Sequence, residues 1–100
     1  MGVFTGHCVS DYRRSVFRDL NSIPIFDATG NHESIQAGRL SHFFNLRGPC
    51  MTVDTACSSS LYALHLAVKS IRSGESDSAL VGGTRLHFNP DETISMSMMG

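Results

Sequence analysis

The chain has 100 residues, enough for one small domain, and its 41% hydrophobic and 17% charged residues are typical of a globular protein rather than a disordered one. The net charge of −1, with acidic and basic residues interspersed, gives no reason to expect nucleic acid or an anionic membrane as a partner. No apolar run approaches the roughly 18–20 residues that span a bilayer, and the first residues lack the basic-then-apolar layout of a secretory signal.

The first half of the chain predicts one strand and two helices. Residues 2–6 are short, apolar and bounded by glycine, which is typical of the end of a buried strand. Ser10 is placed to cap a helix that ends before Pro24, because a residue before proline is driven out of the helical region. A loop over residues 27–30 then leads to a second helix, with Asn31 as its predicted cap. The apolar positions of the two helices are Tyr12, Val16, Phe17 and Leu20, then Ile35, Leu40, Phe43 and Phe44.

The second half predicts two strands with a helix between them. Residues 51–55 have strand character after a turn at 47–49, and residues 78–83 form another short apolar run. The helix between them is predicted over residues 58–73, with Gly74 as its left-handed C-terminal cap. Its expected apolar face consists of Leu61, Leu64, Ala67, Val68 and Ile71. This alternation implies an α/β layered sheet, and because the pattern starts and stops within the sheet we expect a fragment of a larger domain.

Several further residues predict structural roles. Gly82 and Gly83 fit neither a dinucleotide-binding nor a phosphate-binding loop, so close packing of a strand on a helix is the preferred interpretation. Three arginines of the first predicted helix indicate a solvated helix face: Arg13, Arg14 and Arg18. Three methionines near the end of the chain indicate core or tunnel lining: Met96, Met98 and Met99. The histidines have no metal-binding spacing and are expected in structural or surface positions: His7, His32, His42, His65 and His87.

Three cysteines occur in the chain, Cys8, Cys50 and Cys57. An odd number without CxxC spacing argues against a disulfide framework and against a zinc site, so no metal is expected. Free thiols also favour a reducing, cytoplasmic compartment. Cys8 and Cys50 are interpreted as small residues beside a strand.

Cys57 is the candidate nucleophile. It lies between a predicted strand and a predicted helix, and the small residues on both sides allow a sharp turn that exposes the sulfur. The start of a helix favours the anionic thiolate, which is the reactive form of cysteine, and its N–H groups can stabilise an oxyanion. From the residues alone, a buried and inert cysteine at a strand–helix junction is an equally good interpretation.

The string LRGPCMTVDTACSSSL over residues 46–61 closely resembles the active-site signature of β-ketoacyl synthase domains in polyketide synthases. The resemblance extends upstream to residues 11–12 and 28–44 and downstream to about residue 97, so it covers nearly the whole chain. Its general character is that of fungal reducing type I synthases. It implies a thiolase-like fold, of which residues 1–100 would be a partial ketosynthase domain, the N-terminal-half segment that contains the nucleophile.

The resemblance also implies a reaction. Cys57 would accept an acyl chain from the phosphopantetheine of an acyl carrier protein, and a malonyl unit that loses carbon dioxide would then attack that thioester. The backbone N–H of Cys57 would form part of the oxyanion hole, while Asp54, Thr55, Ala56 and Ser58 would support the turn. No cofactor is expected to bind directly. The family also forms homodimers along the strand before the nucleophile, here residues 51–55.

One feature of the family is not found in these residues. Ketosynthases use two further histidines, in an HGTGT-like and an NxGHxE-like motif, and neither motif occurs here. The isolated chain is therefore expected not to catalyse condensation. Two alternatives stay open: a fatty-acid-type condensing enzyme, and a non-catalytic remnant or dimer-contact module. We also expect half of a layered sheet to expose apolar surface and to be marginally stable or prone to aggregate.

Overall fold

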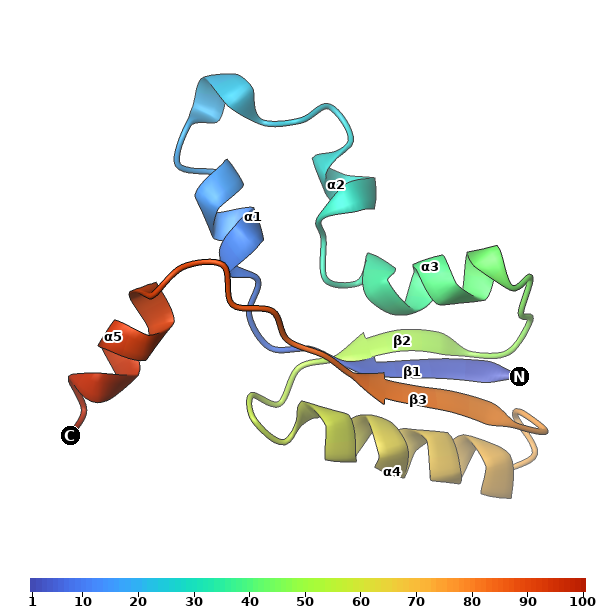
Figure 1. Cartoon of the computed structure of the whole chain (residues 1–100). Helices are drawn as coiled ribbons and strands as arrows, with labels where there is room; N and C mark the ends of the chain where they lie inside the picture. The colour runs from blue at the N-terminus through green and yellow to red at the C-terminus, as the bar shows by residue number, and fades with distance from the viewer.

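Three short parallel strands form the centre of the molecule, in the order β2-β1-β3. The computed structural model describes all residues, 1–100. Short helices surround the sheet, and the whole chain forms a flat body of 44 × 38 × 14 Å (Figure 1). The elements are β1 (Gly2–Gly6), α1 (Asp11–Val16), the 3-10 helix η1 (Leu20–Ser22), α2 (Asp27–Gly30), α3 (Ile35–Phe43), β2 (Cys50–Val53), α4 (Ser59–Arg72), β3 (Ala79–Gly83) and α5 (Asp91–Ser97).

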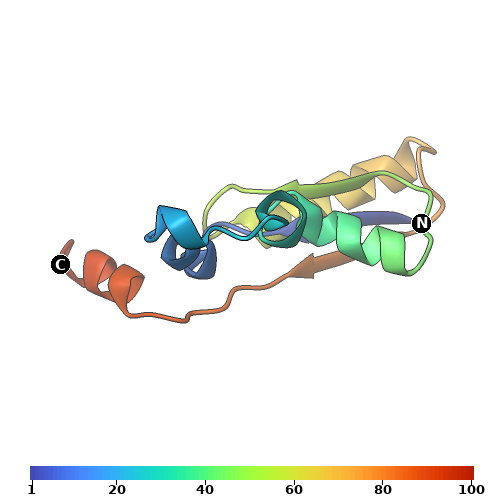
Figure 2. The same ribbon diagram turned by 90° about the horizontal axis from the view of Figure 1, so that it is seen from above.

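The two crossover connections run in opposite directions along the sheet. The chain leaves β1, passes through α1 to α3 and returns as β2 on one side, then passes through α4 and returns as β3 on the other. Since such crossovers are right-handed, opposite directions place the helices on opposite faces. Figures 1 and 2 show α3 and α4 on the two sides of the strands. Because all three strands are parallel, their carboxyl ends lie at the same edge of the sheet.

The side chains of β1 alternate between the two layers. Phe4 faces α4 and packs with Ala63 and Ala67 in the buried core. Its neighbour Thr5 points to the other layer, where its hydroxyl lies 3.0 Å from that of Thr52 on β2. All five residues of β1 are buried, as expected for the central strand of a parallel sheet.

The face of α4 that packs on the sheet is not the one expected from its large apolar residues. The buried positions are Ser59, Ala63, Ala67 and Ser70. Of the five predicted residues only Ala67 is buried; Leu61 is 69% exposed, and Leu64, Val68 and Ile71 are also exposed. Small side chains let the helix axis approach the strands closely, so packing distance rather than side-chain size selects the inner face.

The segment between β1 and α3 departs from the predicted pattern. The first helix ends at Val16, and a separate 3-10 helix follows because the Asp19 carboxylate accepts the N–H of Asn21 and starts a new turn. The predicted loop at 27–30 forms a helical turn, α2. Asn31 does not cap α3; its amide donates to the Asp27 carboxylate at 3.1 Å, and Ser34 takes the N-cap position.

Two predicted caps are confirmed. The Ser10 hydroxyl accepts the N–H of Arg13 at 3.2 Å and begins α1. Gly74 has φ +80°, the left-handed conformation expected after the end of α4.

The prediction that the arginines of the first helix form a solvated face is wrong for Arg13. This guanidinium is partly buried, lies 3.5 Å from Asp27 and 3.6 Å from Glu33, and stacks on the ring of Phe17. The residues that pair with it come from α2 and from the start of the α3 region, which only the crossover brings beside α1.

A large share of the apolar side chains is exposed. Met96, Met98 and Met99 are 60%, 83% and 76% exposed, so they form no part of the core, and only the tunnel-lining half of the prediction stays open. The reason is that α5 does not lie on the sheet (Figure 1). It is joined to the rest of the chain by ion pairs of Asp91 with Arg18 and of Glu92 with Arg85. None of the helices is long and apolar enough to cross a membrane.

Candidate active site

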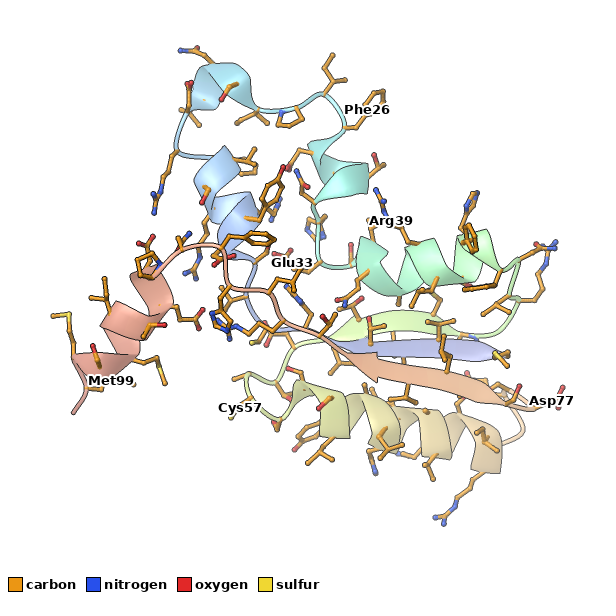
Figure 3. The ribbon with its side chains drawn as sticks, viewed as in Figure 1. Phe26, Glu33, Arg39, Cys57, Asp77 and Met99 are labelled. Atoms are coloured by element: carbon orange, nitrogen blue, oxygen red, sulfur yellow. The ribbon has the colours of Figure 1, made fainter.

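Cys57 lies in the turn that joins β2 to α4, at the edge where the carboxyl ends of the strands meet (Figure 3). Its side chain is exposed, unlike the buried cysteine of the inert alternative. Helix α4 starts at Ser59 with Ser58 as its N-cap, so Cys57 precedes the cap instead of belonging to the first helical turn. The positive end of a 14-residue helix therefore points to this edge of the sheet.

The backbone immediately before the sulfur is in an unusual conformation. Ala56 has φ +56°, the left-handed region that non-glycine residues rarely occupy. The Asp54 carboxylate holds this turn because its Oδ1 accepts the N–H of Ala56 at 2.9 Å. An aspartate that accepts the N–H two residues later is the usual way to stabilise such a turn. The chain thereby reverses direction just before Cys57.

Hydroxyl groups close the other side of the turn. Ser58 Oγ donates to the carbonyl oxygen of Thr55 at 2.7 Å, and the two hydroxyls of these residues are 2.9 Å apart. Because the Ser58 hydrogen is already donated, the Thr55 hydroxyl is the donor between them. Ser59 Oγ accepts the N–H of Thr55 at 2.9 Å and donates to the carbonyl of Ala56 at 2.6 Å.

Ser59 was not singled out in the sequence among three consecutive serines, although it is the buried one. The available signal was its position, four residues after Thr55 at the expected helix start. Ser60 forms no side-chain hydrogen bond, so of these two neighbouring serines only Ser59 stabilises the turn before Cys57.

Two glycines let the start of α4 lie directly on the sheet. A Cβ at Gly6 would stand 2.5 Å from the backbone nitrogen of Ser60 and 2.6 Å from the carbonyl carbon of Ser59. A Cβ at Gly83 would stand 2.7 Å from the Cβ of Ser60, which supports the packing role predicted for this glycine. Nothing lies within 4 Å of a Cβ at Gly82, so the same prediction fails there.

A depression of about 330 Å³ lies beside Cys57. The backbone N–H of Cys57 donates no hydrogen bond within the chain and is available to a bound group. On the opposite side Arg85 donates to the sulfur of Cys8 at 3.0 Å and pairs with Glu92. The lining residues are Gly6, His7, Cys8, Ala56, Cys57, Ser59, Ser60, Gly83, Thr84 and Arg85.

The other cysteines and histidines are distributed differently. Cys50 is exposed on β2, while Cys8 is half-buried and shares the depression with Cys57. His65 is exposed on α4, and His32 bonds to the hydroxyl of its neighbour Ser34. No group of three or more histidine, cysteine and acidic side chains is placed to hold a metal ion.

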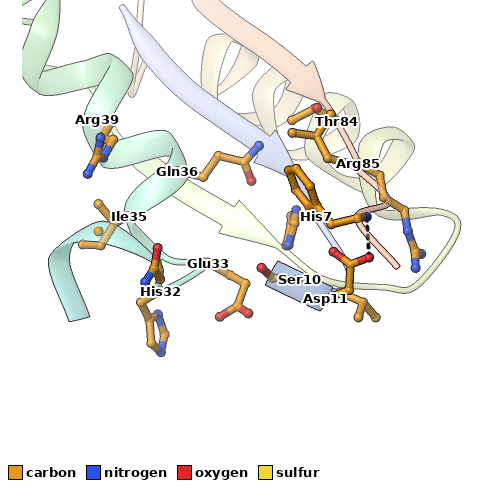
Figure 4. Close-up of a pocket in the computed structure, with 15 residues that line it drawn as sticks. His7, Ser10, Asp11, His32, Glu33, Ile35, Gln36, Arg39, Thr84 and Arg85 are labelled. Carbon is orange, nitrogen blue, oxygen red and sulfur yellow. Dashed lines mark hydrogen bonds between the residues drawn. The ribbon is translucent and has the colours of Figure 1, made fainter. Parts of the chain in front are cut away.

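A second cavity, of about 310 Å³, adjoins the depression on the α1 and α3 side (Figure 4). His7, Thr84 and Arg85 line both spaces. Its other walls come from α1, from the residues ahead of α3 and from the chain that follows β3. The carboxylate of Asp11 lies on its wall (Figure 4).

Comparison with solved structures gives the fold. The chain superposes on a mutant ketosynthase from module 6 of the bacillaene synthase of Bacillus subtilis 168 with a TM-score of 0.83 and 37% identity, over 99% of this chain and 15% of that one. An oxazolomycin ketosynthase domain from Streptomyces albus gives a TM-score of 0.84 and 36% identity, over 99% of this chain and 17% of that one. The thiolase-like fold is therefore confirmed.

Comparison with curated proteins gives the family. A highly-reducing polyketide synthase of Aureobasidium melanogenum is 50% identical over 97% of this chain, and the compactin diketide synthase of Penicillium citrinum is 50% identical over 98%. The chain spans only 4% of the length of either relative. The family model for the β-ketoacyl synthase N-terminal domain matches residues 1–100. The resemblance noted in the sequence is thus confirmed, and the chain belongs to the β-ketoacyl synthase family, as a ketosynthase segment of the polyketide synthase type.

Proposed function

We propose that this chain supplies the acyl-accepting nucleophile of a ketosynthase that elongates polyketide chains, with Cys57 as the acceptor. The observation that carries the proposal is the geometry at Cys57: an exposed sulfur, preceded by a residue with φ +56°, beside a depression of about 330 Å³. A nucleophile held on a rigid turn and open to solvent is the arrangement that covalent acyl transfer requires.

The first step is a thioester exchange. The Cys57 thiolate attacks the carbonyl carbon of an acyl thioester carried on the phosphopantetheine of an acyl carrier protein. In the tetrahedral intermediate the carbonyl oxygen becomes an oxyanion, to which the unpartnered N–H of Cys57 can donate. The bond to the carrier sulfur then breaks, the carrier thiolate leaves and takes up a proton, and the acyl group stays on Cys57.

The second step is the condensation. A malonyl unit on a carrier protein loses carbon dioxide, and the resulting carbanion attacks acyl-Cys57. A carbon–carbon bond forms, the thiolate of Cys57 leaves, and the product is a β-ketoacyl thioester two carbons longer. The two histidine motifs that the family uses for this step do not occur in the sequence. We therefore propose that the isolated chain is acylated but does not condense.

Three further features belong to this proposal. The substrates arrive on acyl carrier protein, so no directly bound cofactor is required. A reducing compartment keeps the Cys57 thiol free, so we place the protein in the cytoplasm. Strand β2 is an edge strand, and pairing of this edge with a second copy accounts for the homodimer expected of the intact domain.

The test is acylation by an acyl thioester of N-acetylcysteamine, a short mimic of phosphopantetheine, followed by intact mass and peptide mapping. We expect one acyl group on Cys57, its loss in Cys57→Ala and its retention in the matched control Cys50→Ala. Addition of a malonyl thioester should release no carbon dioxide above the blank. Acylation that persists in Cys57→Ala would refute the proposal.

A non-catalytic dimer-contact module is the second candidate, favoured by the exposed Cys50 and Met51 on the β2 edge. It predicts a dimer in analytical ultracentrifugation together with no thioester exchange at Cys57. Acylation of Cys57 would decide against it, whatever the oligomeric state.

A further inference from the structure

The segment that follows β3, residues 84–90, contains no helix or strand, yet it forms part of the nucleophile's surroundings. Thr84 and Arg85, its first two residues, line the depression beside Cys57. Their position therefore depends on what holds the rest of the segment. Every hydrogen bond or ion pair that involves a side chain joins this segment to α1, to α5, or to Cys8 between β1 and α1.

Asp11 is the buried tie among them. It is the first residue of α1 and is 6% exposed. Its Oδ2 accepts the N–H of Phe88 at 2.8 Å, the bond that is dashed in Figure 4. The same oxygen accepts the N–H of Asn89 at 3.3 Å, so it holds two consecutive peptide groups. Other contacts also hold the segment: the ring of Phe88 lies 5.8 Å from that of Tyr12, and Asn89 donates to Ser15 at 3.3 Å. Arg85 pairs with Glu92 and donates to the sulfur of Cys8 at 3.0 Å.

The carboxylate is held in its charged form. The N–H of Phe88 lowers the pKa of Asp11 most strongly, burial opposes this shift, and the N–H of Asn89 adds to the lowering. The nearby charge of His87 acts in the same direction. An ionised acceptor bonds to backbone N–H groups about twice as strongly as a neutral one, which makes Asp11 a strong anchor for Phe88 and Asn89.

We infer that Asp11 is a positioning residue for the Cys57 depression, acting through residues 84–90 to hold Thr84 and Arg85 against the nucleophile. The inference rests on the proposed function of Cys57. Asp11 makes no hydrogen bond to Cys57 or its turn, so its effect is indirect. It ties α1 to a segment 77 residues later in the chain, and that segment begins where β3 ends beside α4.

The first measurement is amide hydrogen exchange across the full chain in Asp11→Ala and Asp11→Asn. Loss of two charge-assisted hydrogen bonds should speed exchange at Phe88 and Asn89 about tenfold or more in Asp11→Ala, and the increase should extend to Thr84 and Arg85. Asp11→Asn keeps an acceptor oxygen and should recover part of the protection. An increase confined to 88–89, with 84–85 unchanged, overturns the inference.

The second measurement separates positioning from simple loosening of the fold. Acylation of Cys57 by the thioester is compared with iodoacetamide alkylation of Cys50, which lies on β2 away from the depression and serves as an internal standard. We expect the Cys57-to-Cys50 ratio to fall about fivefold or more in Asp11→Ala, in proportion to the lost hydrogen bonds. The matched control Asp19→Ala, which removes an exposed carboxylate that accepts a local N–H, should leave the ratio unchanged.

The two readouts distinguish the possible failures. An unchanged ratio in Asp11→Ala, with wild-type Cys57 acylated normally, overturns the positioning role and leaves the proposed function intact. If wild-type Cys57 is not acylated, the proposed function fails, and the exchange at Thr84 and Arg85 alone decides whether Asp11 holds the wall of the depression.

Discussion

Replacement of Gly6 by alanine should be among the most damaging single-methyl changes in this chain. The added Cβ would lie 2.5 Å from the nitrogen of Ser60 and 2.6 Å from the carbonyl carbon of Ser59. Both are backbone atoms at the start of α4, so no side-chain rotation relieves the clash. The shorter contact is about 0.9 Å inside the 3.4 Å at which ordinary contacts begin.

The size of the effect follows from what would have to move. Extra methylene groups in packed cores cost about 1–3 kcal/mol when side chains can adjust, and here the helix start itself must shift, so we expect about 3 kcal/mol or more. The same shift would pull Ser59 from its bonds to Thr55 and Ala56 and disturb the turn that carries Cys57. Stability and thiol reactivity should therefore fall together.

The assay is urea unfolding followed by circular dichroism, with iodoacetamide alkylation of Cys57 measured in parallel. Gly38→Ala is the matched control because nothing lies within 4 Å of its Cβ and it sits inside α3, where alanine should stabilise by about 0.5–1 kcal/mol. If Gly6→Ala unfolds at the wild-type urea concentration and Cys57 reacts normally, the tight contact between β1 and α4 is not what holds the site.

Three further predictions concern the turn and Asp11. Ser59→Ala should lose about 1–3 kcal/mol and slow acylation of Cys57, since a buried N–H and a carbonyl lose their partner, whereas Ser60→Ala should be within about 0.5 kcal/mol of wild type; equal effects in urea unfolding would contradict this. At Ala56, where φ is +56°, a valine should destabilise by about 1–2 kcal/mol and a glycine should not; the same unfolding assay checks it, and a harmless valine would show that the turn is unstrained. The lowered pKa of Asp11 means that its contribution to stability is present above the ordinary value of 3.8 and is lost as pH falls through the lowered pKa. Wild type should therefore exceed Asp11→Asn in urea midpoint near neutral pH and converge with it in acid, and a constant gap between about pH 6 and about pH 3 would contradict that sign.

Much of the site follows from local sequence because its parts are close along the chain. Asp54 and Ala56 are two residues apart, and Ser58 lies one residue beyond Cys57. Turns and helix caps of this kind depend on bonds between residues two to four apart, which a sequence pattern can specify. The left-handed Gly74 was predictable for the same reason, whereas the residues alone left Cys57 open between an exposed and a buried position.

The inner face of α4 and the roles of Gly6 and Asp11 came only from the tertiary structure. The large apolar residues of α4 indicated the wrong face, because the closeness of the sheet selects alanine and serine there. Gly6 must lack a side chain owing to Ser59 and Ser60, more than fifty residues away, and Asp11 holds a segment near residue 88. Sequence alone predicted the alternation of strands and helices and, through the resemblance, Cys57 as the candidate nucleophile, since both rest on local patterns. The crossover connections determine which distant residues come into contact, and therefore which residues line the depression beside Cys57.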